Sequence, residues 1–111
     1  MFGNLFNKGN IISAEEAYEI MTQNKDVIVL DVRTVQEYKT GAIQGARLIP
    51  VDQLSIRATV DLPNKDQTIL VYCQSGGRAG QAVNILKNLG YTNAVSFGGI
   101  MSWPYAISKV A

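Results

Sequence analysis

The sequence has no histidine and a single cysteine, Cys73, among its 111 residues. Without histidine, the chain has no Cys-His pair, no Ser-His-Asp triad and no histidine-based metal site. A single cysteine forms no intramolecular disulfide, so a reactive Cys73 has no resolving thiol in the same chain. Any nucleophilic chemistry at Cys73 therefore depends on activation by the residues around it.

Charge is scarce and nearly balanced, with ten Lys and Arg residues against nine Asp and Glu residues and a formal net charge of +1. No cluster of basic residues is present, so we expect no binding to nucleic acid or acidic membranes. No apolar run reaches transmembrane length, and the first residues lack the basic and apolar regions of a secretory signal. These absences, together with a free thiol, predict a cytoplasmic protein.

An apolar fraction of 47% over 111 residues predicts one domain that buries its core without disulfides, metals or cofactors. We expect a lead-in over residues 1–10, a domain over 11–107 and a short tail over 108–111. Phe2, Leu5 and Phe6 of the lead-in are candidates for packing on the domain.

Short apolar runs alternate with helical patterns along the chain. Ser13 and Glu16 form a capping-box pattern, which predicts a helix over about 14–23. Strands are predicted at 11–12, 27–30, 47–49, 68–72 and 93–97, and further helices near 35–38, at 51–58, at 78–89 and at 100–106. This order predicts an α/β fold with a central parallel sheet of about five strands and helices on both faces.

The most informative stretch is the turn that begins at Cys73, between the predicted strand 68–72 and the helix from about Arg78. Gly76 and Gly77 accept positive φ values, which lets backbone N–H groups curl toward one point. The following helix directs its unpaired N–H groups and its positive dipole end at the same point. Helix N-termini and nearby cations lower thiol pKa values from about 8.5 to roughly 3.5–7.5.

We therefore expect Cys73 to be a thiolate nucleophile whose reaction partner is an anion. The residues expected to hold that anion are Gln74, Ser75, Gly76, Gly77 and Arg78. The alternative, an inert core cysteine, is common for a lone cysteine after a strand but leaves the glycines and the arginine unexplained. A phosphate-binding P-loop is excluded because its G-x-x-x-x-G-K-[ST] pattern is absent.

Asp31 and Arg33 directly follow the predicted strand 27–30. Ligands of parallel α/β sheets bind at the carboxyl ends of the strands, so both residues are candidates for supporting the cysteine loop. The other interpretation is a pair that satisfies loop backbone groups and stiffens this edge, and we favour it.

The order of these motifs resembles a single-domain rhodanese, a sulfurtransferase. The resemblance spans about residues 11–107 and rests on four blocks that occur in the order of the family. They are 30–33 with Glu37 and Tyr38, 41–46 with Ile49 and Pro50, 72–78, and 98–99 with Trp103. One departure is Ala42, which stands where the family often has histidine in a structural loop.

The resemblance implies that Cys73 attacks the outer sulfur of a donor such as thiosulfate or a persulfide. The enzyme then holds this sulfur as a persulfide and passes it to a thiol or cyanide, with a protein donor or acceptor also compatible. The amides of the loop would stabilise these anions. Arg78, and secondarily Arg33, would hold the remaining oxygens of the donor.

Two other functions fit the same motifs. A cysteine-loop phosphatase or arsenate reductase also ends its loop in arginine, but its C-x-x-x-x-x-R spacing has five intervening residues, whereas Cys73 and Arg78 are separated by four. A non-catalytic binding module of the same fold commonly lacks the cysteine, which is present here.

Overall fold

The computed structural model describes residues 10–109. Its centre is a four-stranded sheet in the order β3 (Arg47–Leu48), β1 (Ile28–Asp31), β4 (Ile69–Cys73) and β5 (Ala94–Gly99). All three pairings are parallel. The strand expected at 11–12 is reduced to a single parallel bridge between Ile11 and Ser96, next to β5.

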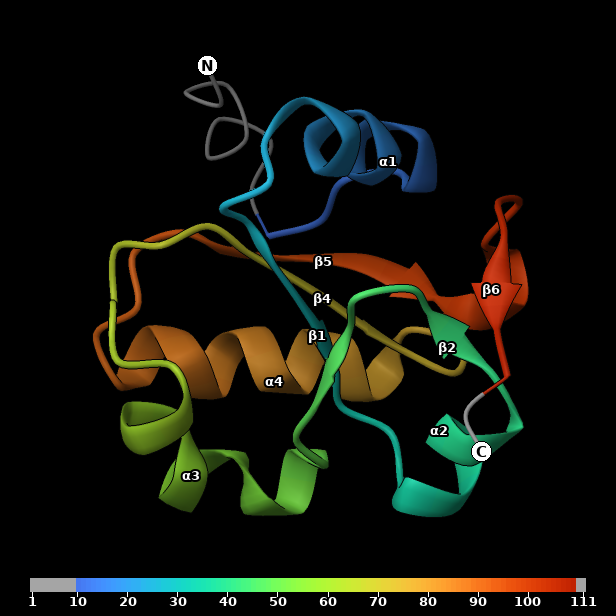
Figure 1. The fold of residues 1–111 in the computed structure, drawn as a ribbon. Helices are drawn as coiled ribbons and strands as arrows, with labels where there is room; N and C mark the ends of the chain where they lie inside the picture. Colours follow the sequence, from blue (N-terminus) through green and yellow to red (C-terminus); the bar gives the residue numbers. More distant parts are fainter. Residues whose placement is uncertain (1–9, 110–111) are drawn as a thin grey trace.

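Helices cover both faces of this sheet, which confirms the predicted α/β class (Figure 1). On one face lies α1 (Ala14–Gln23), whose bounds and Ser13–Glu16 capping box agree with the sequence prediction. On the other face lie α3 (Leu54–Asp61) and α4 (Gly77–Asn88). The short helix α2 (Val35–Thr40) follows β1.

Strand β4 is buried along its whole length because both of its faces meet a hydrophobic core. Ile69, Val71 and Cys73 belong to the core shared with α3 and α4. Leu70 and Tyr72 point the opposite way, into the core shared with α1. This alternation, which has the period of two typical of strands, places the thiol on the side of the sheet where α4 begins.

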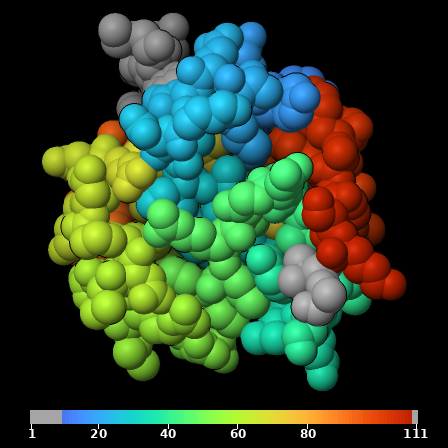
Figure 2. Space-filling model, viewed as in Figure 1, coloured from blue at the N-terminus to red at the C-terminus, as the bar shows by residue number. Residues whose placement is uncertain are grey.

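The predicted closing helix over 100–106 is wrong. A 3-10 turn, η3 (Ile100–Ser102), ends at Trp103, whose extended ψ of 112° is the conformation favoured before a proline, here Pro104. The chain then forms β6 (Ile107–Ser108), which pairs antiparallel with β2 (Ala42–Ile43). Figure 2 shows this C-terminal segment in red at the surface. Ser108, the first residue of the predicted tail, is thus part of β6.

The helix predicted at 51–58 begins and ends later in the sequence, as α3 at Leu54–Asp61. A 3-10 turn, η2 (Val51–Gln53), precedes α3, and neither element has a side-chain N-cap. In the connection after α3, Leu62 is fully buried and Lys65 Nζ donates to the Leu89 carbonyl at 2.7 Å. The candidate packing residues Phe2, Leu5 and Phe6 lie outside the described residues.

Candidate active site

The Cys73 sulfur lies at the end of β4 and accepts two backbone hydrogen bonds. The Gly76 N–H lies 3.0 Å from Sγ and the Ala79 N–H lies 3.3 Å from it. Cys73 itself is almost fully buried, with 1% of its surface exposed. Two backbone N–H groups directed at one atom form a site of positive partial charge there. The arrangement can therefore stabilise negative charge on Sγ.

Glycine geometry brings these amides together. Gly76 precedes α4 with a φ of +123°, a value that side-chain-bearing residues rarely adopt. The first backbone bond of α4 runs from Gly80 N–H to the Gly76 carbonyl. Within residues 10–109, the N–H groups of Gly77 and Arg78 have no hydrogen-bond acceptor, as is usual in a first helical turn. They remain available to an anion near Sγ.

The end of β5 holds the other side of the loop. A Cβ placed on Gly99 would lie 2.2 Å from the Gln74 carbonyl oxygen and 2.6 Å from Ser75 Cα, so only glycine fits here. The Met101 N–H then donates to the same Gln74 oxygen at 3.1 Å. Gly98 and Gly99 are thus the last residues of β5, and Gly99 contacts the loop.

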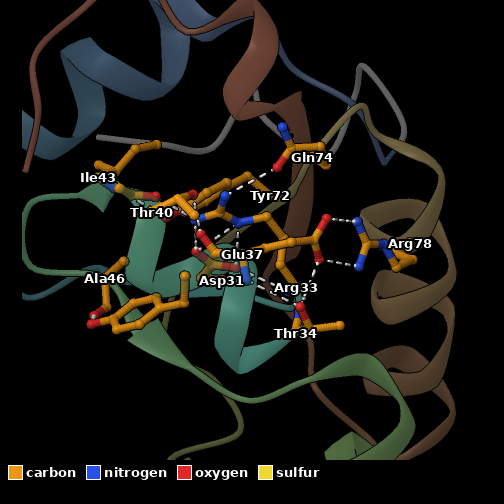
Figure 3. A network of polar contacts seen from close by, with 12 residues as sticks. Asp31, Arg33, Thr34, Glu37, Thr40, Ile43, Ala46, Tyr72, Gln74 and Arg78 are labelled. Atoms are coloured by element: carbon orange, nitrogen blue, oxygen red, sulfur yellow. Dashed lines mark hydrogen bonds and ion pairs between the residues drawn. The ribbon is translucent and has the colours of Figure 1, made fainter. Parts of the chain in front are cut away.

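The side chains of the loop differ in their surroundings. Gln74 turns toward Arg33, whose Nη1 donates to Gln74 Oε1 at 3.1 Å (Figure 3). Ser75 and Gly77 are exposed, and Gly76 and Arg78 are partly buried. The predicted anion-holding residues therefore form one continuous loop around Cys73, although the Gln74 side chain is engaged by the protein.

Arg78 is held by Glu37 of α2. Nη1 and Nη2 lie 2.7 and 2.9 Å from Glu37 Oε1 and Oε2, which is a two-pronged ion pair (Figure 3). Thr34 fixes the carboxylate further, because its N–H donates to Glu37 Oε1 at 3.0 Å. Hydrogen bonding to Arg78 lowers the pKa of Glu37 to about 2, and the same contact raises the pKa of Arg78. Both groups are therefore charged at neutral pH.

Sequence reasoning missed this pair. Glu37 and Arg78 are 41 residues apart, and Glu37 was noted only as part of the family pattern. The capping box that it forms with Thr34 is a local signal for the start of α2, and it contains nothing about Arg78.

Asp31 and Arg33 form a second, buried pair behind the loop. They are 0% and 2% exposed, and Arg33 Nη2 lies 2.8 Å from Asp31 Oδ2. Arg33 Nη2 also donates to the Gly41 carbonyl at 2.7 Å, and its Cζ lies 5.6 Å from the centre of the Tyr72 ring. Burial, with Asp31 as a further cause, raises the pKa of Tyr72.

The expectation that Arg33 holds donor oxygens does not fit this position. Arg33 is buried, and each nitrogen of its guanidinium already has a protein acceptor. Asp31 and Arg33 bind each other and the Gly41 carbonyl, and Arg33 contacts the loop through Gln74. That the pair stiffens the edge of the sheet stays a prediction.

Residues 13–105 match the rhodanese-like domain family. The chain belongs to this family. It is 38% identical to the thiosulfate sulfurtransferase PspE of Escherichia coli over 71 residues, which cover 64% of this chain and 68% of PspE. It is 34% identical to a sulfurtransferase of Allochromatium vinosum over 95 residues, covering 85% of this chain and 87% of that one.

The fold agrees with this membership. A solved structure described as a rhodanese with anions from E. coli superposes with a TM-score of 0.70 at 34% identity, covering 74% of this rhodanese-like chain and 96% of the other. The predicted family is therefore confirmed, and sulfurtransferase activity is supported as the general class of function.

Residues 10–109 contain neither a candidate metal centre nor a candidate membrane span. No three His, Cys, Asp or Glu side chains gather there in a way that would hold a metal ion. None of the helices in this range is long and apolar enough to cross a membrane.

Proposed function

We propose that this rhodanese-like domain carries a sulfane sulfur as a persulfide of Cys73, taken from thiosulfate or a persulfide and given to a thiol or cyanide. The observation that supports it most is the pair of amides from Gly76 and Ala79 directed at Sγ. The charged form of a thiol is the nucleophile, and these donors stabilise it.

In the first half-reaction the Cys73 thiolate attacks the outer sulfur of the donor. A bond forms between Sγ and that sulfur, the donor's S–S bond breaks, and its electron pair leaves with the remainder of the donor. With thiosulfate the leaving group is sulfite, and with a persulfide it is a thiolate. In the second half-reaction the acceptor attacks the outer sulfur of the Cys73 persulfide, and the Cys73 thiolate leaves.

The loop suits both states of this cycle because thiolate and persulfide are both anions. The unpaired amides of Gly77 and Arg78 lie beside the two that already bind Sγ, and they supply donors for an added sulfur atom. The contacts of Gly99 with the loop backbone hold these donors in place before the sulfur arrives. A cytoplasmic location, where thiols stay reduced, remains a prediction.

Intact-protein mass spectrometry tests this proposal. The wild-type protein is expected to gain the mass of one sulfur on incubation with thiosulfate or a low-molecular-weight persulfide, and to lose it on addition of cyanide. Cys73→Ser is expected to gain none. A Cys73→Ser/Ser55→Cys double variant is the matched control, since it places the only thiol on the exposed face of α3, away from the loop.

The results separate sulfur transfer from a non-catalytic binding function. A gain that requires Cys73 and fails for the thiol at position 55 supports sulfur transfer by this loop. If the wild type gains no sulfur from either donor, the proposal is wrong, and the non-catalytic binding module becomes the better description.

A further inference from the structure

The charge balance around the cysteine loop bears on the choice of donor. Two arginines contact the loop, and each is already paired with a carboxylate. Arg78 binds both oxygens of Glu37, and Arg33 binds Asp31. The formal charges of these four groups cancel, so the Cys73 thiolate leaves the site with a net negative charge.

The two classes of donor make different demands on such a site. Thiosulfate is a dianion, and its attack by a thiolate gathers three negative charges and releases doubly charged sulfite. A simple alkyl persulfide carries at most one charge and releases a singly charged thiolate. Since Coulomb energy scales with the product of the charges, the dianion is repelled more strongly than the persulfide by a thiolate whose charge no free cation compensates.

Glu37 is the more exposed of the two carboxylates in these pairs. Its side chain is 31% exposed and that of Arg78 is 33% exposed, whereas Asp31 and Arg33 are buried. Without Glu37, the Arg78 side chain at the end of the loop would lose this partner and carry an unneutralised positive charge. With Glu37, its two terminal nitrogens face a carboxylate at 2.7 and 2.9 Å.

We propose that Glu37 is a specificity-determining residue, which neutralises Arg78 and thereby makes the loop prefer singly charged persulfide donors over thiosulfate. This inference rests on the proposed sulfur transfer through Cys73. Glu37 acts through Arg78 and does not touch the donor.

The test compares kcat/KM for thiosulfate and for 2-hydroxyethyl persulfide, a donor whose only ionisable group is the persulfide. Glu37→Gln removes the charge and keeps the shape of the side chain. We expect it to raise kcat/KM for thiosulfate by about fivefold to tenfold, mainly through a lower KM, and to change that for the persulfide by less than about twofold. Glu37→Asp, which keeps the charge, should retain the wild-type ratio.

Asp61→Asn is the matched control. Asp61 pairs with Arg57 on α3 at 2.9 Å, and its side chain is 35% exposed, close to the value for Glu37. This control makes the same change in net charge and also breaks a half-exposed arginine pair, but on a helix that carries none of the loop residues. We expect both donors to be used as by the wild type.

Several outcomes would overturn the inference. Equal changes for the two donors in Glu37→Gln would mean that Glu37 only holds Arg78 in place, and a loss of thiosulfate use would mean that the pair itself is needed. If Glu37→Gln does not fold, the salt dependence of the wild-type protein still tests the inference. Repulsion between thiosulfate and the site predicts that kcat/KM for thiosulfate rises with ionic strength more steeply than kcat/KM for the persulfide.

Failure of the proposed function is recognised separately. If mass spectrometry shows no sulfur on wild-type Cys73 with either donor, sulfur transfer and the inference about Glu37 both fail. If sulfur is acquired from both donors but their ratio is insensitive to Glu37→Gln and to salt, only the inference about Glu37 fails.

Discussion

Replacement of Asp31 by asparagine is expected to destabilise the protein strongly, although the two side chains have nearly the same shape. Asp31 is fully buried and binds the Arg33 side chain through both oxygens, with Nε and Nη2 at 2.8–3.1 Å. Asparagine keeps one acceptor oxygen but removes the charge. The Arg33 guanidinium, with 1% of its side chain exposed, then remains as an uncompensated buried cation.

Breaking a buried ion pair in this way costs about 3–5 kcal/mol of the free energy of unfolding. The corresponding change in the exposed pair, Asp61→Asn, leaves Arg57 with 42% of its side chain in solvent and should cost about 0.2–1 kcal/mol. Because domains of this size lose about 4–8 °C in Tm per kcal/mol, Asp31→Asn should lower Tm by at least ~12 °C.

Urea unfolding of the two single variants measures this difference directly. A double variant, Asp31→Asn/Arg33→Met, adds a sharper test, since removing the guanidinium also removes the unpaired charge. We expect the double variant to be more stable than the sum of the single effects predicts, by about 2–3 kcal/mol. A cost of Asp31→Asn below 1 kcal/mol, or one equal to that of Asp61→Asn, would refute the reasoning from burial.

Three further predictions concern the loop and the core. Gly99→Ala should impair sulfur uptake and lower Tm, because its Cβ would lie 2.2 Å from the Gln74 carbonyl oxygen. Gly80→Ala is the control: it adds a Cβ in open space within α4 and should raise the free energy of unfolding in urea by about 0.5–1 kcal/mol. Since Arg78 lowers the pKa of Glu37 from 4.5 to about 2, the stability that ionised Glu37 contributes is complete above pH 4.5 and is lost as the pH falls toward 2. The difference in urea stability between wild type and Glu37→Gln should shrink over that window, and a constant difference would contradict this pKa. Trp103→Phe should change the free energy of unfolding by less than about 1 kcal/mol. The buried indole N–H has no acceptor in residues 10–109, so removing it also removes the free-energy cost of burying an unpaired donor. A loss above about 2 kcal/mol would show that the indole N–H does have a hydrogen-bond acceptor.

Local signals in the sequence were sufficient for the elements that carry the chemistry. The capping box of Ser13 and Glu16 located α1 to the residue, because a cap is formed by side chains within four positions of each other. The apolar run before Cys73 and the helical spacing after Gly77 likewise predicted β4, the loop and α4. Cys73 and the amides around its sulfur can therefore be predicted from one continuous stretch of sequence.

Contacts between distant segments were not readable in this way. The pairing of β2 with β6 joins Ile43 to Ile107, and no pattern within either two-residue strand indicates its partner. The helix predicted at 100–106 failed for a related reason: its apolar spacing was helical, but Trp103 precedes a proline and takes the extended conformation that leads into β6.

The same division between local and distant contacts runs through the site. The amides that bind the Cys73 sulfur come from residues 76–79, whereas the arginines beside them are paired with Asp31 at the end of β1 and with Glu37 in α2. A substitution at Glu37 therefore changes the charge beside the loop without altering Cys73 or its amide donors. If Cys73 carries sulfur as proposed, donor preference can change through α2 while the proposed reaction at Cys73 stays the same. For this reason the ratio of two donors reports on Glu37 more directly than either rate alone.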